Sequence, residues 1–156
     1  MRSTSARTIL VILLVTVVVL GIVPYAQADE HRDCSNATLN GSFGYTITGF
    51  SFSAPPPLAG SFGQVGRQTF DGNGATTATA WVSQNGNIVA VTITGTYTVN
   101  PDCTGTFATQ ISPLGLTGQT FFVIDASGVE LRAINTDPGA VITTVGSRQF
   151  VAGDRK

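Results

Sequence analysis

Few side chains in this sequence could perform acid–base or nucleophilic chemistry. Of 156 residues, 11% are charged, and the chain has one His and two Cys, whereas globular domains average about 25% charged residues. The single histidine, His31, precedes the body of the expected domain, where it is badly placed to activate a serine or cysteine nucleophile. One His also rules out zinc motifs built on two histidines. The sequence therefore identifies no catalytic residue, and we expect no metal and no cofactor.

The side chains better suited to ligand binding are aromatic and aliphatic, with one arginine. Arg67 shares strand parity with Val65, so it could point into an apolar interior and form a polar handle with Tyr45 and Tyr97. Such a handle suits a carbonyl or carboxylate group. We favour the alternative, an outward Arg67, because a buried guanidinium without a partner is costly.

A second set of candidate binding residues is apolar and lies around two long connections, 53–61 and 112–119. Its members are Phe50, Phe52, Leu58, Leu114 and Leu116. Pro55, Pro56 and Pro57 interrupt the first of these connections. Whether these side chains meet at one end of the domain depends on the strands that flank the two connections.

Those elements have the pattern of β-strands. In residues 88–99, Val91, Ile93 and Tyr97 share one parity while threonines occupy the other, which predicts a strand with one buried face. Clusters of Gly, Asn, Asp and Pro divide the rest of the chain into strand-length pieces. The predicted strands are 42–52, 62–70, 75–82, 88–99, 104–111, 120–126, 129–135 and 141–150.

Eight strands in series predict an all-β domain. Short connections favour antiparallel pairing of neighbours, and closure of the sheet removes its exposed edges. We predict an eight-stranded antiparallel up-and-down barrel, with a β-sandwich as the alternative. Connections 53–61, 83–87, 112–119 and 136–140 would then share one end, which we name the mouth. The apolar set at this end would line a ligand entrance or, alternatively, plug the barrel as a hydrophobic cap.

The N-terminal segment has the pattern of a secretory signal peptide. Arg2 and Arg7 precede an apolar run over 9–23, and Ala26-Gln27-Ala28 supplies small residues at cleavage spacing. The run is shorter than the about 20 residues that span a membrane. We predict a signal peptide at 1–28, an N-terminal segment at 29–41, the barrel at 42–151 and a tail at 152–156. The mature protein would be secreted or periplasmic, with no membrane span after cleavage.

Such a destination predicts that Cys34 and Cys103 form a disulfide, because disulfides persist in oxidising compartments. In the barrel both residues lie at the end opposite the mouth, since each strand reverses the chain direction. The formal charge of -1 and the lack of a Lys/Arg cluster argue against a nucleic-acid partner. The sequence does not indicate an oligomeric state.

Four stretches together resemble a group of exported, mostly uncharacterised bacterial proteins. They are Cys34–Tyr45, Thr69–Gly74, Gly95–Gly105 and Ile134–Gly139, and the turn with Cys103 is the most specific. These proteins are similar to the allene oxide cyclase-like, or calycin-like, barrels. The resemblance implies a barrel that encloses an apolar molecule, and relatives of that shape include cyclases. No catalytic residue of those cyclases maps onto this chain by motif.

Two functions fit these observations. The first is an exported barrel that binds, or cyclises, a small apolar molecule in or at its mouth. The second is a non-catalytic structural or interaction module that contacts proteins or the cell envelope through a Thr-rich outer surface. We favour the first, which requires an open interior cavity, whereas a solidly filled interior would support the second.

Overall fold

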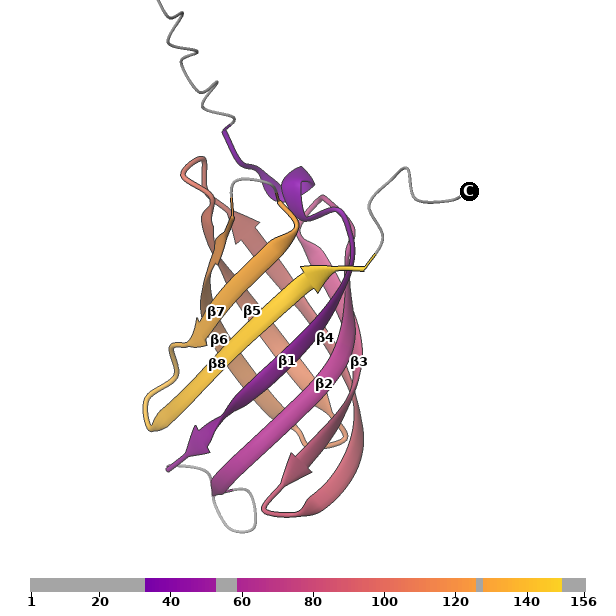
Figure 1. Ribbon diagram of the computed structural model, residues 1–156, viewed down its shortest axis with the longest axis vertical. Helices are drawn as coiled ribbons and strands as arrows, with labels where there is room; N and C mark the ends of the chain where they lie inside the picture. Colours follow the sequence, from indigo (N-terminus) through magenta and orange to yellow (C-terminus); the bar gives the residue numbers. More distant parts are fainter. Residues whose placement is uncertain (1–32, 53–58, 126–127, 150–156) are drawn as a thin grey trace, which may run out of the picture. The chain divides into compact units, whose positions relative to one another are not determined.

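The computed structural model describes residues 33–52, 59–125 and 128–149 as a closed β-barrel (Figure 1). A short 3-10 helix, η1 (Asn36–Leu39), comes before the first strand. The strands are β1 (Gly41–Ser51), β2 (Gly60–Phe70), β3 (Ala75–Gln84), β4 (Asn87–Val99), β5 (Thr104–Ser112), β6 (Leu116–Ile124), β7 (Glu130–Asn135) and β8 (Ala140–Arg148). The predicted signal peptide and Leu58 lie outside the described residues.

Each strand pairs antiparallel with the next, and β8 pairs with β1 to close the sheet. This arrangement confirms the up-and-down barrel and rules out the sandwich. Strand β4 has the predicted faces, because Val91 and Ile93 are buried while Thr92 and Thr94 are exposed. The threonine ladder is therefore part of the outer wall.

In strand β2 the inward and outward faces are reversed relative to the expectation that Val65 points into the barrel. Val65 is 63% exposed, whereas Gln64 is only 5% exposed. The cause lies in the neighbouring strand, where Tyr45 faces the interior and pairs with Gly66. Directly paired residues lie on the same face of a sheet, so Gly66 and the even-numbered residues around it point inward. The inward orientation considered for Arg67 is therefore wrong, and the favoured outward one is confirmed.

Strand β6 begins earlier than predicted. The segment 112–119 was expected to be a long mouth connection, but Leu116 already pairs with Ile111 of β5. Gly115 adopts a φ of 66°, a left-handed conformation that suits glycine and allows a tight turn here. The connection is consequently short, and Leu116 belongs to the barrel wall.

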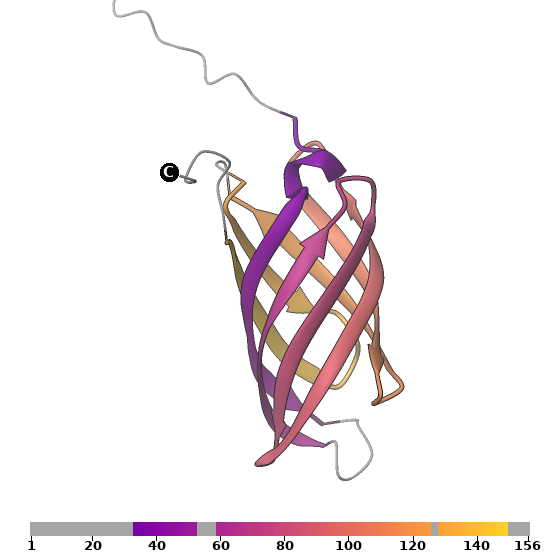
Figure 2. The ribbon, with the colours of Figure 1, turned by 90° about the vertical axis from the view of Figure 1, so that its right-hand side faces the viewer.

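Cys34 and Cys103 form the predicted disulfide, with their Cα atoms 4.9 Å apart. This end of the barrel carries η1, as both ribbon views show (Figures 1 and 2). Leu39 of η1 is fully buried in the interior. Tyr97 donates its hydroxyl hydrogen to the Asn36 carbonyl oxygen at 3.1 Å, and Val99 N–H donates to Asn36 Oδ1 at 2.8 Å. The helix is thereby attached to β4 and closes this end.

Arg148, at the end of β8, also stabilises this end of the barrel through hydrogen bonds to η1 and to the segment before β7. Its Nη2 donates to the carbonyl oxygens of Thr38 at 2.8 Å and Gly128 at 3.2 Å. Its guanidinium carbon lies 4.7 Å from the centroid of the Phe43 ring, a cation–π distance. One side chain thus joins η1, the segment before β7 and the core.

Candidate functional site

The two halves of the barrel interior are packed differently. The half next to η1 is filled by aromatic rings, with Phe43, Phe70 and Phe122 at most 1% exposed. Phe107 stacks on Phe122 with 4.3 Å between ring centroids, and Phe70 meets Tyr97 edge-on at 5.1 Å. We call this the closed half, because its rings pack with Leu39 into one buried cluster near the disulfide.

The half toward the mouth contains a cavity of about 380 Å³. Its wall combines apolar side chains with a few amides and hydroxyls. The apolar part includes Ile47, Phe62, Val82, Ile93, Ile111 and Ile142. Small residues are also part of this wall, among them Ala78, Gly118 and Ala140.

The most buried polar group on this wall is a pair formed by Tyr45 of β1 and Gln64 of β2. Gln64 Nε2 donates to the Tyr45 hydroxyl at 2.6 Å, and the two residues are 5% and 6% exposed. Burial raises the pKa of Tyr45 above its ordinary value, and the hydrogen bond from Gln64 opposes that effect. The phenol is therefore neutral at pH 7. A Cβ at Gly66 would lie 2.7 Å from this hydroxyl, so glycine there leaves the hydroxyl its space.

A second amide, Gln68, lies deeper along β2 on the same face. Its Nε2 donates to Thr76 Oγ1 at 3.0 Å, and that hydroxyl donates to the Thr69 carbonyl oxygen at 2.9 Å. Gln68 also lines the cavity. Its amide nitrogen is thus engaged by the protein.

One carboxylate, Asp137, lies on the cavity rim. Its Oδ2 accepts the Gln119 backbone N–H and Asn135 Nδ2, both at 2.9 Å. These donors, from β6 and from the end of β7, fix the carboxylate in place. Tyr45 and Asp137 are the ionisable side chains among the described residues of the cavity wall.

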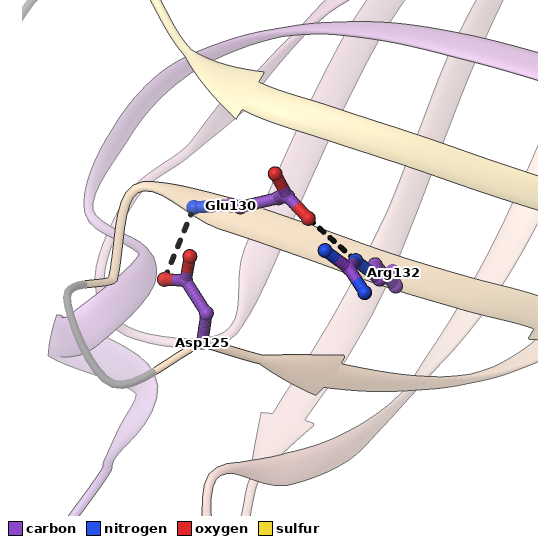
Figure 3. A network of polar contacts seen from close by, with 3 residues as sticks. All are labelled: Asp125, Glu130 and Arg132. Atoms are coloured by element: carbon purple, nitrogen blue, oxygen red, sulfur yellow. Dashed lines mark hydrogen bonds and ion pairs between the residues drawn. The ribbon is translucent and has the colours of Figure 1, made fainter.

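The cations of the described chain lie away from this wall. Arg67 is exposed on the outer face, where its Nη2 donates to Ser42 Oγ at 3.0 Å. Arg132 pairs with Glu130 outside the barrel, and Asp125 Oδ1 accepts the Glu130 N–H at 3.3 Å (Figure 3). Arg148 donates to the Thr38 carbonyl oxygen at the closed end of the barrel. Among the described wall residues, none is Lys, Arg or His.

Three of the predicted site residues line the cavity: Tyr45, Leu114 and Leu116. Tyr97 does not line it and is instead buried in the aromatic cluster of the closed half. Arg67 does not, because β2 turns it outward. The polar handle that an inward Arg67 would have formed with Tyr45 and Tyr97 is therefore absent. Tyr45 pairs instead with Gln64, which hydrophobicity along β2 does not point inward. The register between β1 and β2 identifies Gln64 as an inward residue, because Tyr45 pairs with Gly66 and even-numbered residues of β2 share that face.

Phe50 and Phe52 also differ from their predicted positions. Phe50 shares the outward parity of Thr46 and Thr48 and pairs with the exposed Val141 on β8. Phe52 is 65% exposed, and its ring centroid lies 4.7 Å from that of Phe50. The two rings form an exposed pair beside the mouth rather than a wall of the entrance.

The outer wall has a hollow of its own, of about 390 Å³, over β2 to β5. Val65, Trp81, Ala90 and Pro113 line it, and Trp81 is 64% exposed. The described residues lining it include no ionisable side chain. Its position on the convex wall separates it from the interior cavity.

The described residues include no group of three or more His, Cys, Asp or Glu that could hold a metal ion. No helix within the described ranges is long and apolar enough to cross a membrane.

The likeness to solved structures supports this fold. Two redesigned β-barrels match, one with a TM-score of 0.53 and 16% identity over 74% of this chain and 95% of its own. The other, mFAP1 bound to DFHBI, has a TM-score of 0.52 and 18% identity over 72% of this chain and 97% of its own. No protein-family model and no curated protein matches the chain. The comparisons therefore support the barrel shape but not the allene oxide cyclase-like family.

Proposed function

We propose that this protein binds a small, mainly apolar molecule inside the mouth half of its barrel. The observation that carries this proposal is the cavity of about 380 Å³ beside a solidly packed half. Sites for small molecules fall in the range of about 300 to 1,000 Å³ and combine apolar walls with a few polar groups. The wall described above has that composition. The redesigned barrel mFAP1, which is similar in fold, also holds a small molecule, DFHBI.

The unequal packing favours binding over a purely structural role. An unfilled apolar space costs stability, by about 24 cal/mol for each Å³ in core-deletion experiments. A barrel that served only as a stable module would gain from filling the mouth half as fully as the closed half. The wall of the cavity instead includes small residues such as Ala78 and Gly118.

The proposal is limited to binding and assigns no catalytic step. Relatives of the barrel shape that the sequence resembles include cyclases, but none of their catalytic residues maps onto this chain. Asp137, the one carboxylate on the described wall, is already held by two N–H donors. We also propose a secreted or periplasmic location, which the disulfide supports because such bonds persist in oxidising compartments.

Neighbouring threonines on β8 provide a test with a matched control. Thr144 lines the cavity, whereas Thr143 faces outward. Thr144→Trp should fill the cavity and weaken binding of the neutral fluorescent probe N-phenylnaphthylamine about tenfold or more, while Thr143→Trp should leave it unchanged. Fluorescence titration of folded protein measures both. Failure of the wild-type protein to bind the probe, or equal binding by the two variants, would refute the proposal.

A further inference from the structure

We infer that the ligand is a neutral molecule with a carbonyl or hydroxyl oxygen on an apolar frame, and that the Tyr45–Gln64 pair is its anchor. This inference rests on the proposed function and names the class of molecule that the cavity selects. It follows from the hydrogen-bonding capacity of the pair, from its surroundings and from the charge of the wall.

The pair has hydrogen-bonding capacity that the protein does not use. In the described chain, Tyr45 and Gln64 bond to each other, which uses one donor and one acceptor. With Gln64 Nε2 as the donor, the phenol hydrogen and Gln64 Oε1 remain for a ligand. With the amide turned over, the remaining groups are Nε2–H and the phenol oxygen. In either orientation the pair offers the cavity a donor and an acceptor.

The surroundings make that capacity selective. Both side chains line the cavity and are more than nine-tenths buried, close to Ile47 and Ala78. Hydrogen bonds are stronger in such a low-dielectric setting, and a buried polar group without a partner is costly. A ligand oxygen placed beside the pair forms hydrogen bonds with its remaining polar groups. A pure hydrocarbon displaces water from these groups and leaves them without a hydrogen-bond partner. Sites built this way reject analogues that lack the polar group.

The charge of the wall excludes ions from the same position. A carboxylate brought to Tyr45 would find no Lys, Arg or His among the described wall residues to balance it. Its desolvation would therefore be uncompensated. Asp137 on the rim adds charge of the same sign, and the N–H groups of Gln119 and Asn135 already donate to its carboxylate. A carboxylate ligand, which an inward Arg67 would have suited, is therefore disfavoured.

Three naphthalene derivatives of similar size separate these effects: acetonaphthone, a neutral ketone; ethylnaphthalene, a hydrocarbon; and naphthoate, a carboxylate. Calorimetric or competition titration at pH 7 measures each dissociation constant. Tyr45→Phe should weaken acetonaphthone binding about 3- to 10-fold, the value of one hydrogen bond, and leave ethylnaphthalene within about twofold. Wild-type protein should bind naphthoate about tenfold or more weakly than the ketone.

Tyr97→Phe is the matched control, because it also removes a buried tyrosine hydroxyl but lies in the closed half. It should leave all three constants unchanged. An infrared readout on wild-type protein needs no variant: the carbonyl stretch of bound acetonaphthone should shift to lower frequency than in hydrocarbon solvent.

The outcomes distinguish this inference from the proposed function. If Tyr45→Phe weakens the ketone and the hydrocarbon equally, if naphthoate binds best, or if the bound carbonyl shows no shift, the anchor is refuted while binding stands. If wild-type protein binds none of the three, both proposals are refuted.

Discussion

Cys34 and Cys103, 69 residues apart in the sequence, are joined at the end of the barrel opposite the cavity. The Cys34 N–H also donates to the Pro101 carbonyl oxygen at 3.1 Å, so the residues before η1 are attached to the β4–β5 turn. This attachment holds Leu39 over the aromatic cluster. The disulfide therefore fastens one end of the barrel while the cavity lies toward the other, and Phe107 of the buried cluster forms part of the cavity wall.

Removal of this bond should lower stability without abolishing ligand binding. The chain-entropy relation gives about 4 kcal/mol for a loop of this length, and typical measured effects are about 2 to 4 kcal/mol. We expect urea unfolding of a Cys34→Ala/Cys103→Ala variant to show a loss in that range, with probe affinity in the folded variant unchanged. An unaltered unfolding free energy would contradict the prediction.

Two adjacent phenylalanines on β6 test the assignment of the barrel faces. Phe122 is fully buried against Phe107, whereas Phe121 is 40% exposed on the outer wall. Phe122→Ala should cost about 3 to 5 kcal/mol, as for other buried aromatic deletions, and Phe121→Ala about 1 kcal/mol or less. Denaturant titration measures both free energies. Equal losses would show that the closed half is not packed as described.

The entrance can be tested by comparing Leu116 with Phe52. Leu116 lines the cavity, whereas Phe52 is exposed beside Phe50. Leu116→Ser should weaken apolar-probe binding about fivefold or more, since burial of a leucine side chain is worth about 1.5 to 3 kcal/mol. Phe52→Ser should leave binding nearly unchanged. The reverse ranking in a fluorescence titration would place the entry path on the Phe52 side.

Acid should destabilise the β2–β3 turn through Asp71. Its Oδ1 accepts the backbone N–H groups of Asn73, Gly74 and Ala75 at 2.7, 3.0 and 2.9 Å, and these bonds lower its pKa. A lowered folded-state pKa means that the contribution is present above the ordinary pKa of about 3.9 and is lost as pH falls through the folded value. Asp71→Asn should therefore show a shallower fall in the urea midpoint below about pH 4 than wild type. Parallel curves would exclude a role for this carboxylate.

Export and processing remain predictions, because residues 1–28 lie outside the described chain. We expect protein recovered from the extracytoplasmic fraction of its host to begin near Asp29 and to carry no free thiol. Intact-mass measurement before and after alkylation without reduction tests both points. A product that retains residues 1–28 would contradict the signal-peptide interpretation.

Alternation of residue types was enough to predict the barrel and most of its faces. Strand β4 shows why: Val91 and Ile93 against Thr92 and Thr94 leave one consistent inward face. The positions of Cys34 and Cys103 relative to the strand count likewise placed them at one end. Both inferences depend on local periodicity and on chain reversal, which the sequence carries directly.

The candidate site was decided by the tertiary structure. Strand β2 reads Gln64, Val65, Gly66 and Arg67, and hydrophobicity alone points Val65 inward. Pairing with β1 places Gln64 inside instead, because Tyr45 and Gly66 share a face. The Tyr45 hydroxyl accepts a hydrogen bond from the Gln64 amide, which makes the buried amide tolerable. A polar residue can enter a barrel when a partner from another strand meets it there. That partner is set by register between strands, which residue types within one strand do not encode.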